Sequence, residues 1–151
     1  MNIPFEKRNG GRPETGRKND CAVIALSNAL NISYFESENF LAANGRKLNR
    51  GTYTQTIFGF NLNQHKIILN HKLHLLFKQK LVSHNSKRWN ILTYKMVGIS
   101  LNQFLLKRLP GTYMCNTRKH IFTVKDGVVL SAQREGGRCI LTDIWYIEKI
   151  N

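Results

Sequence analysis

The order of its predicted elements makes this chain an α+β protein, with helices first and an antiparallel sheet last. Apolar residues recur at helical spacing over 21–30, and a capping-box pattern indicates a second helix over 34–43. After Pro110 and Gly111 the pattern changes to short runs rich in β-branched and aromatic residues. With 151 residues, of which 42% are hydrophobic, the chain is expected to form one globular domain, 1–151.

Two helices are predicted near the start of the chain. The first covers 21–30, and either Asn19 or Asp20 can serve as its N-cap. The second covers 34–43 and follows Ser33, which opens a capping-box pattern. In the first helix, apolar residues at 22, 23, 26, 29 and 30 have the spacing expected of a helix.

The middle of the chain is less regular. A short helix is predicted over 52–58, and another over 100–109, with Ser100 as its cap and Pro110 as its stop. Between them, the apolar runs within 61–90 fit both strand and helix, interleaved with lysines and histidines. Secondary structure in that segment is therefore left open.

The last third of the chain predicts a sheet. Asp126 and Gly127 between two β-rich runs are typical of a two-residue hairpin turn. The polar segment 1–18, rich in Gly and Arg, is predicted to be irregular. The predicted strands are 112–115, 120–125, 128–133, 138–141 and 144–147.

Charge is the unusual property of the composition. Lys and Arg number 23 against 9 Asp and Glu, which gives a formal net charge of +14. No acidic residue lies between Glu38 and Asp126, so this stretch cannot neutralise itself through internal ion pairs. We expect it to present a positive surface to an anionic partner, either an acidic protein or nucleic acid. The residues expected on this surface are Arg46, Lys47, Arg50, Lys66, Lys72, Lys78, Lys80, Lys87 and Arg88.

The cysteines point to a reducing compartment. Cys21, Cys115 and Cys139 are odd in number, and no pair has the spacing of a metal site. No apolar run has the length of a membrane span, and the first residues lack a signal-peptide pattern. We expect reduced thiols in a cytoplasm, with no metal, no cofactor and no membrane association.

One cysteine and one histidine are candidates for nucleophilic chemistry. Cys21 is expected in the first turn of a helix, where unpaired backbone N–H groups and the helix dipole favour a thiolate. His120 is expected at the start of the hairpin, apart from the basic cluster that holds the other histidines. Together they predict a Cys–His pair, with His120 as the base.

Hairpin geometry predicts which residue orients the histidine. With a two-residue turn at 126–127, Gln133 lies opposite His120 and Ser131 lies one diagonal step away. Asp126 is excluded, because it is six residues along the strand, about 20 Å from His120 at the usual rise. Gln133 is therefore the preferred orienting residue, as an amide oxygen can accept the imidazole N–H, and Ser131 is the second choice.

At these residues the chain resembles the papain-like cysteine peptidases, in particular the relatives of bacteriocin-leader peptidases that occur in bacteria and phages. The resemblance implies that Cys21 is the nucleophile and His120 the general base of a papain-like domain, with 61–90 as a basic insertion. It also suggests a phage-encoded protein acting in a host cytoplasm. The matching residues are Asn19-Asp20-Cys21, Ser33-Tyr34, Gly45-Arg46, Gly51-Thr52 and SLNQFLLKRLPGTYMCNTRKHIFTVKDGVVLSA at 100–132.

The chain departs from the family pattern at two positions. The family usually has an aspartate where this chain has Ser131, and an oxyanion-hole glutamine where this chain has Thr15. Asn19 is the candidate substitute for that glutamine, together with the backbone N–H of Cys21.

Two functions remain open on the sequence. The first is a cytosolic cysteine peptidase whose basic surface recruits an acidic target. The second is a catalytically weak or inactive peptidase-fold protein that binds nucleic acid or an acidic host protein. Selective reactivity of Cys21 would favour the first, and salt-sensitive binding would favour the second.

Overall fold

A computed structural model describes residues 3–43, 46–51, 65–68, 80–85, 90–95, 99–118 and 120–149. In the segments at 65–68, 80–85 and 90–95, at 143 and over 145–149, it describes the backbone alone. The elements in chain order are β1 (Phe5–Lys7), α1 (Cys21–Leu30), α2 (Tyr34–Ala43), β2 (His65–Ile68), β3 (Lys80–Asn85), β4 (Asn90–Lys95), α5 (Leu101–Leu106), β5 (Thr112–Thr117), β6 (Ile121–Lys125), β7 (Val128–Ser131) and β8 (Leu141–Lys149).

The fold is α+β, as predicted, and its strands form one mixed sheet. Within the described ranges the sheet has eight strands in the order β1-β7-β6-β5-β8-β4-β3, and β2 pairs with β8. The prediction of an antiparallel sheet is wrong at one edge, because β1 pairs in parallel with β7. The predicted irregular lead-in therefore contains an edge strand of three residues. That length is too short for an alternating pattern to be visible in the sequence.

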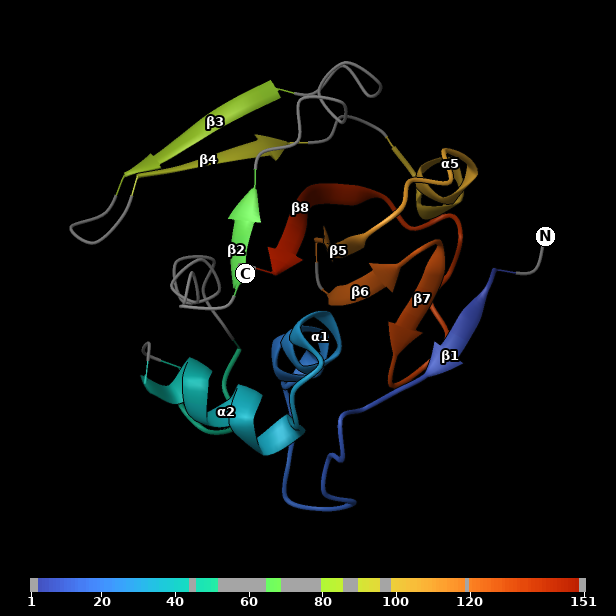
Figure 1. Ribbon diagram of the computed structural model, residues 1–151. Helices are drawn as coiled ribbons and strands as arrows, with labels where there is room; N and C mark the ends of the chain where they lie inside the picture. Colours follow the sequence, from blue (N-terminus) through green and yellow to red (C-terminus); the bar gives the residue numbers. More distant parts are fainter. Residues whose placement is uncertain are drawn as a thin grey trace.

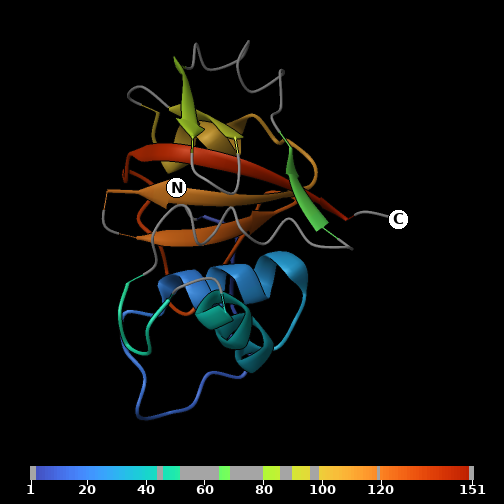
Figure 2. The ribbon, with the colours of Figure 1, turned by 90° about the vertical axis from the view of Figure 1, so that its left-hand side faces the viewer.

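The helices lie on both faces of the sheet (Figures 1 and 2). On one face α1 packs against the central strands, mainly over β6, and α2 packs against α1. On the other face α5 packs against the sheet. Among the described residues, no helix is both long enough and apolar enough to cross a membrane.

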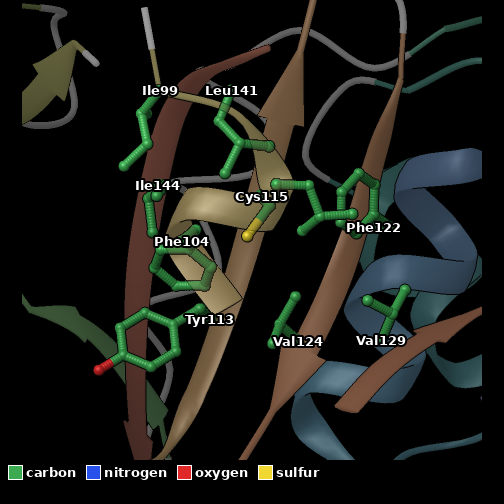
Figure 3. Packing of buried hydrophobic residues seen from close by; sticks show 10 residues of the cluster. Ile99, Phe104, Tyr113, Cys115, Phe122, Val124, Val129, Leu141 and Ile144 are labelled. Carbon is green, nitrogen blue, oxygen red and sulfur yellow. The ribbon is translucent and has the colours of Figure 1, made fainter. Parts of the chain in front are cut away.

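The apolar core is divided into two clusters by the sheet. Along β5, Met114 joins the cluster under α1, whereas Tyr113 and Cys115 join the cluster under α5. Figure 3 shows the second cluster, where the rings of Phe104 and Tyr113 meet edge to face at 5.4 Å. Burial of apolar side chains of this size contributes roughly 1.5–3 kcal/mol each to stability. The four residues of β6 at 121–124 are all buried, because helices cover both faces of that strand.

The predicted bounds of the first two helices are confirmed, and those of the third described helix are partly confirmed. The capping box at Ser100 forms with Gln103, but α5 ends at Leu106, three residues earlier than predicted. The chain leaves the helix there, since Arg108 takes a left-handed backbone conformation with φ of 47°. The helix predicted over 52–58 lies outside the described residues.

The predicted hairpin is confirmed. Lys125 pairs with Val128 across the turn, and Asp126 and Gly127 both have positive φ, at 48° and 82°. This conformation matches the right-handed twist of the flanking strands and favours Asp-Gly. The strand predicted over 144–147 lies within β8, whereas the strand predicted over 138–141 is wrong except at Leu141, where β8 starts.

Candidate active site

Cys21 is the first residue of α1, and its side chain is half-buried. The helix is attached to the sheet by polar contacts on its buried side. Thr123 of β6 donates from Oγ1 to the carbonyl of Ala25 at 2.6 Å. The amide of Asn28 donates to the carbonyl of Arg8 at 3.0 Å. These contacts hold the N-terminus of α1 beside the start of β6.

His120 lies directly before β6 and is held by the last residue of β5. Its backbone N–H donates to Oγ1 of Thr117 at 3.1 Å, and the backbone N–H of Thr117 donates to its carbonyl at 2.7 Å. The imidazole is 29% exposed and lines the same pocket as the thiol of Cys21, and the interaction of the two groups raises the pKa of His120. The two members of the predicted Cys–His pair therefore lie close together in the fold, although they are far apart in the sequence.

A carboxylate orients the imidazole. Nε2 of His120 lies 2.7 Å from Oε1 of Glu135, whose side chain is only 11% exposed. The hydroxyl of Ser131 donates to the same oxygen at 2.8 Å. With Nε2 engaged by Glu135, Nδ1 is the nitrogen left for Cys21.

The choice of Gln133 as orienting residue is thereby corrected. β7 ends at Ser131, and the chain then bends, so the ladder does not extend to residue 133. Gln133 is exposed at the rim of the site, while the following loop brings Glu135 back to His120. The second choice, Ser131, is in place but contacts Glu135 instead of the imidazole.

The surroundings of Cys21 and His120 favour a thiolate–imidazolium pair. Burial raises the pKa of the Cys21 thiol, but the combined effect of His120 and the backbone N–H groups of Ile121 and Ala22 lowers it below the ordinary 9.0. The hydrogen bond to Cys21 and then that to Glu135 raise the pKa of His120 to about 10, against the opposing effect of burial. Both shifts point to the charged pair at neutral pH.

A small cavity gives access to this pair. It has a volume of about 210 Å³ and lies between the start of α1, the start of β6 and the end of β7. Its polar lining includes Arg12, Asp20, Cys21, His120, Ser131 and Gln133. We call this cavity the Cys21 pocket.

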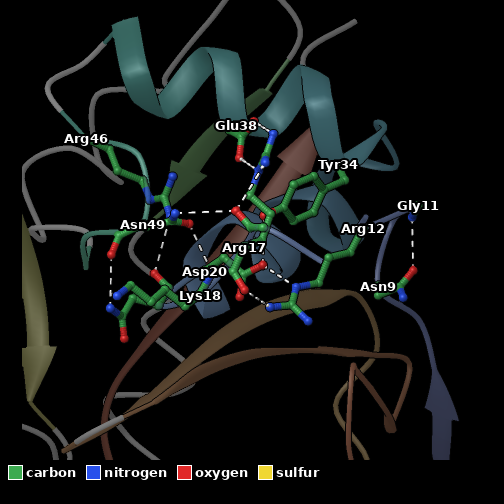
Figure 4. A network of polar contacts seen from close by, with 12 residues as sticks. Asn9, Gly11, Arg12, Arg17, Lys18, Asp20, Tyr34, Glu38, Arg46 and Asn49 are labelled. Carbon is green, nitrogen blue, oxygen red and sulfur yellow. Dashed lines mark hydrogen bonds and ion pairs between the residues drawn. The ribbon is translucent and has the colours of Figure 1, made fainter. Parts of the chain in front are cut away.

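A second polar network lies behind the first turn of α1 (Figure 4). Asp20 is buried, and its Oδ2 accepts from Nε of Arg12 and from the hydroxyl of Tyr34 at 2.7 Å. Asp20 is the N-cap residue as predicted, but its side chain makes no capping hydrogen bond to the helix. Arg17 and Glu38 form a two-point ion pair beside it, at 2.7 and 3.1 Å.

The two predicted oxyanion residues lie outside the Cys21 pocket, which corrects that prediction. Asn19 has a left-handed backbone with φ of 52°, and its exposed amide donates to the carbonyl of Asn49 at 3.0 Å. Thr15 is exposed in a bend of the lead-in. Neither lines the pocket. Arg12 does, and sequence reasoning missed it because no pattern links a loop arginine to a distant thiol.

The prediction that Arg46 belongs to the basic surface is also wrong. Arg46 is only 5% exposed, and its Nη2 donates to the carbonyl of Asn19 at 3.3 Å. Lys47 and Arg50 are exposed, as expected of an anion-binding surface. The remaining members have no described side chain: Lys66, Lys72, Lys78, Lys80, Lys87 and Arg88.

Glu135 was also missed, although the sequence contains a signal for it. It shares strand parity with Ser131 and Gln133, which predicts the same face as His120. Extending the hairpin register places Glu135 beyond His120, but Gly136 and Gly137 follow it and allow the chain to turn.

Among the described side chains, no cluster of three or more His, Cys, Asp or Glu could hold a metal ion.

Comparison with models of protein families, with curated proteins and with solved structures finds no match for this chain. The function is therefore argued from the geometry of the site.

Proposed function

We propose that this protein is a cysteine peptidase with a papain-like arrangement, in which Cys21 is the nucleophile, His120 the general base and acid, and Glu135 the residue that orients His120. One observation supports this most directly. The thiol at the start of α1 and the imidazole before β6 line one pocket and shift each other's pKa, and the carboxylate after β7 lies 2.7 Å from the imidazole. Such a chain of nucleophile, base and orienting group is what covalent acyl transfer requires.

The first half of the proposed reaction forms an acyl-enzyme. The Cys21 thiolate attacks the carbonyl carbon of the substrate, and a C–S bond forms as the carbonyl electron pair moves to oxygen. The intermediate then collapses, the bond from carbon to the leaving nitrogen breaks, and Nδ1 of His120 gives its proton to that nitrogen. The raised pKa of His120 keeps this proton available at neutral pH.

The second half releases the product. His120, now neutral, accepts a proton from a water molecule that attacks the thioester carbon, and the C–S bond breaks to return the thiolate. Glu135 keeps the imidazole in one orientation through both halves, and Ser131 keeps Glu135 in place. The carboxylate also stabilises the imidazolium each time it forms.

The proposed target is acidic. The chain has a net charge of +14, and Lys47 and Arg50 are exposed on the segment that follows α2. A positive surface near the site would attract an acidic substrate and accelerate its encounter with the enzyme.

The test is acylation of Cys21 by the small uncharged ester p-nitrophenyl acetate. We expect a burst of p-nitrophenolate of one equivalent per protein, with an acetyl adduct on the peptide that contains Cys21. The variant Cys21→Ser should abolish the burst. The matched variant Cys139→Ser should retain it, because burial raises the pKa of that half-buried thiol. Acetylation spread over all three thiols, or no burst, would refute the proposal.

A further inference from the structure

Arg12 lies in the Cys21 pocket but has no part in the reaction described above. It belongs to the lead-in between β1 and α1, and its side chain is 30% exposed. It lines the same cavity as Cys21 and His120. A cation in the same pocket as a nucleophilic thiol needs a chemical explanation, and two further observations supply one.

First, the guanidinium is held in a fixed orientation. Its Nε donates to Oδ2 of buried Asp20, and its Nη2 donates to the carbonyl of Arg17 at 2.8 Å. Asp20 is in turn held by the hydroxyl of Tyr34. Figure 4 shows the arginine directed at this carboxylate. These two contacts use the Nε and Nη2 side of the planar guanidinium, and Nη1 carries two more N–H donors.

Second, the first turn of α1 begins at this pocket, and its first backbone N–H groups have no partner within the helix. The first backbone bond of the helix runs from the N–H of Ile24 to the carbonyl of Asp20 at 3.1 Å. The N–H of Cys21 precedes it, and the side chain of Asp20 makes no capping bond to the helix because it faces Arg12 and Tyr34. The N-terminus of α1 therefore has donors available for an anion that forms beside Cys21.

Resting on the peptidase activity proposed above, we infer that Arg12 is a catalytic residue that donates, with the backbone N–H of Cys21, to the oxyanion formed when the thiolate attacks a carbonyl. Negative charge leaves sulfur and reaches the carbonyl oxygen in that step. A donor that is already fixed stabilises this charge without reorganisation. Asp20 acts as a positioning residue, because it holds the guanidinium and does not contact substrate.

The test compares two reactions of the same thiol in the full-length protein. Acylation by p-nitrophenyl acetate passes through an oxyanion, whereas alkylation by iodoacetamide displaces iodide and forms none. For Arg12→Ala we expect acylation to fall by about 100-fold, the usual effect of removing one oxyanion donor. Alkylation of Cys21 should be nearly unchanged. Arg12→Lys, which keeps the charge without the fork, should give an intermediate acylation rate.

The matched control is Arg8→Ala, which removes an arginine from the same lead-in. Nη2 of Arg8 contacts Oδ1 of Asn31 at 3.5 Å, and Arg8 does not line the pocket, so both rates should stay at the wild-type value. Rapid labelling of buried Cys115 would report unfolding of Arg12→Ala, and Arg12→Lys would then decide the test. Acylation unaffected in both variants, or an equal loss of acylation and alkylation, would overturn the inference. A wild-type protein that is not acylated would instead refute the peptidase.

Discussion

Cys21 and Cys115 lie on opposite faces of the same sheet and differ in what surrounds the sulfur. Burial raises the pKa of both thiols. At Cys115, in the interior of β5, the neighbours are the apolar side chains of the cluster beneath α5, and the pKa is strongly raised. At Cys21, His120 and two backbone N–H groups reverse the direction. Burial alone makes a thiol inert, and hydrogen-bond donors and positive charge make it reactive.

The largest expected effect is the difference in reactivity between these two thiols. In the folded protein at pH 7, limiting iodoacetamide should label Cys21 at least about 100-fold faster than Cys115, since only the thiolate reacts. Mass spectrometry of the peptides after a short labelling time measures the ratio. Unfolding in guanidinium chloride should bring the two rates together. Equal, slow labelling of both thiols in the folded state would show that Cys21 is no more reactive than Cys115.

The next effect isolates the contribution of the histidine. His120→Gln removes the hydrogen bond and the charge that lower the pKa of Cys21, while burial continues to raise it. The pKa of Cys21 should therefore rise, and labelling at pH 7 should fall by about tenfold for each unit of increase. The pH dependence of labelling measures this shift. A labelling curve that does not move would show that the helix terminus alone activates the thiol.

The smallest effect concerns the carboxylate. Glu135→Gln keeps a hydrogen-bond acceptor but removes the charge that helps to raise the pKa of His120 to about 10. The imidazolium then loses its proton at lower pH. The turnover of p-nitrophenyl acetate should therefore begin to fall at a lower pH than in the wild-type protein. Gln133→Ala is the matched control, because Gln133 lies at the rim of the pocket. In this variant the pH at which turnover falls should not change. A larger shift of this pH for Gln133→Ala would show that Gln133, the residue predicted from the hairpin register, orients His120 instead.

Local signals predicted much of the fold. The bounds of α1 and α2, the capping box at Ser100 and the hairpin at Asp126 all follow from side-chain chemistry within a few residues. The placement of Cys21 in the first turn of a helix follows from the same signals. Each of these features depends on neighbours in the chain, which the sequence displays directly.

Contacts between distant segments could not be predicted in the same way. The partner of His120 depends on where β7 ends and how the following loop turns, and this brings in Glu135 instead of Gln133. Arg46 is basic in the sequence but buried in the fold against the carbonyl of Asn19. Hydrophobic periodicity contains no information on such polar contacts, because they are selected by the packing of whole elements.

The sequence by itself therefore determined the α+β order of the elements, the hairpin register and a thiol at the start of a helix, since these depend on backbone sterics and local hydrogen bonds. Only the tertiary structure decided which groups surround that thiol. Packing α1 against β6 brings His120 to Cys21, and the folding of the loop and lead-in adds Glu135 and Arg12. Their effect is electrostatic, and it depends on distances that exist only once the elements have packed.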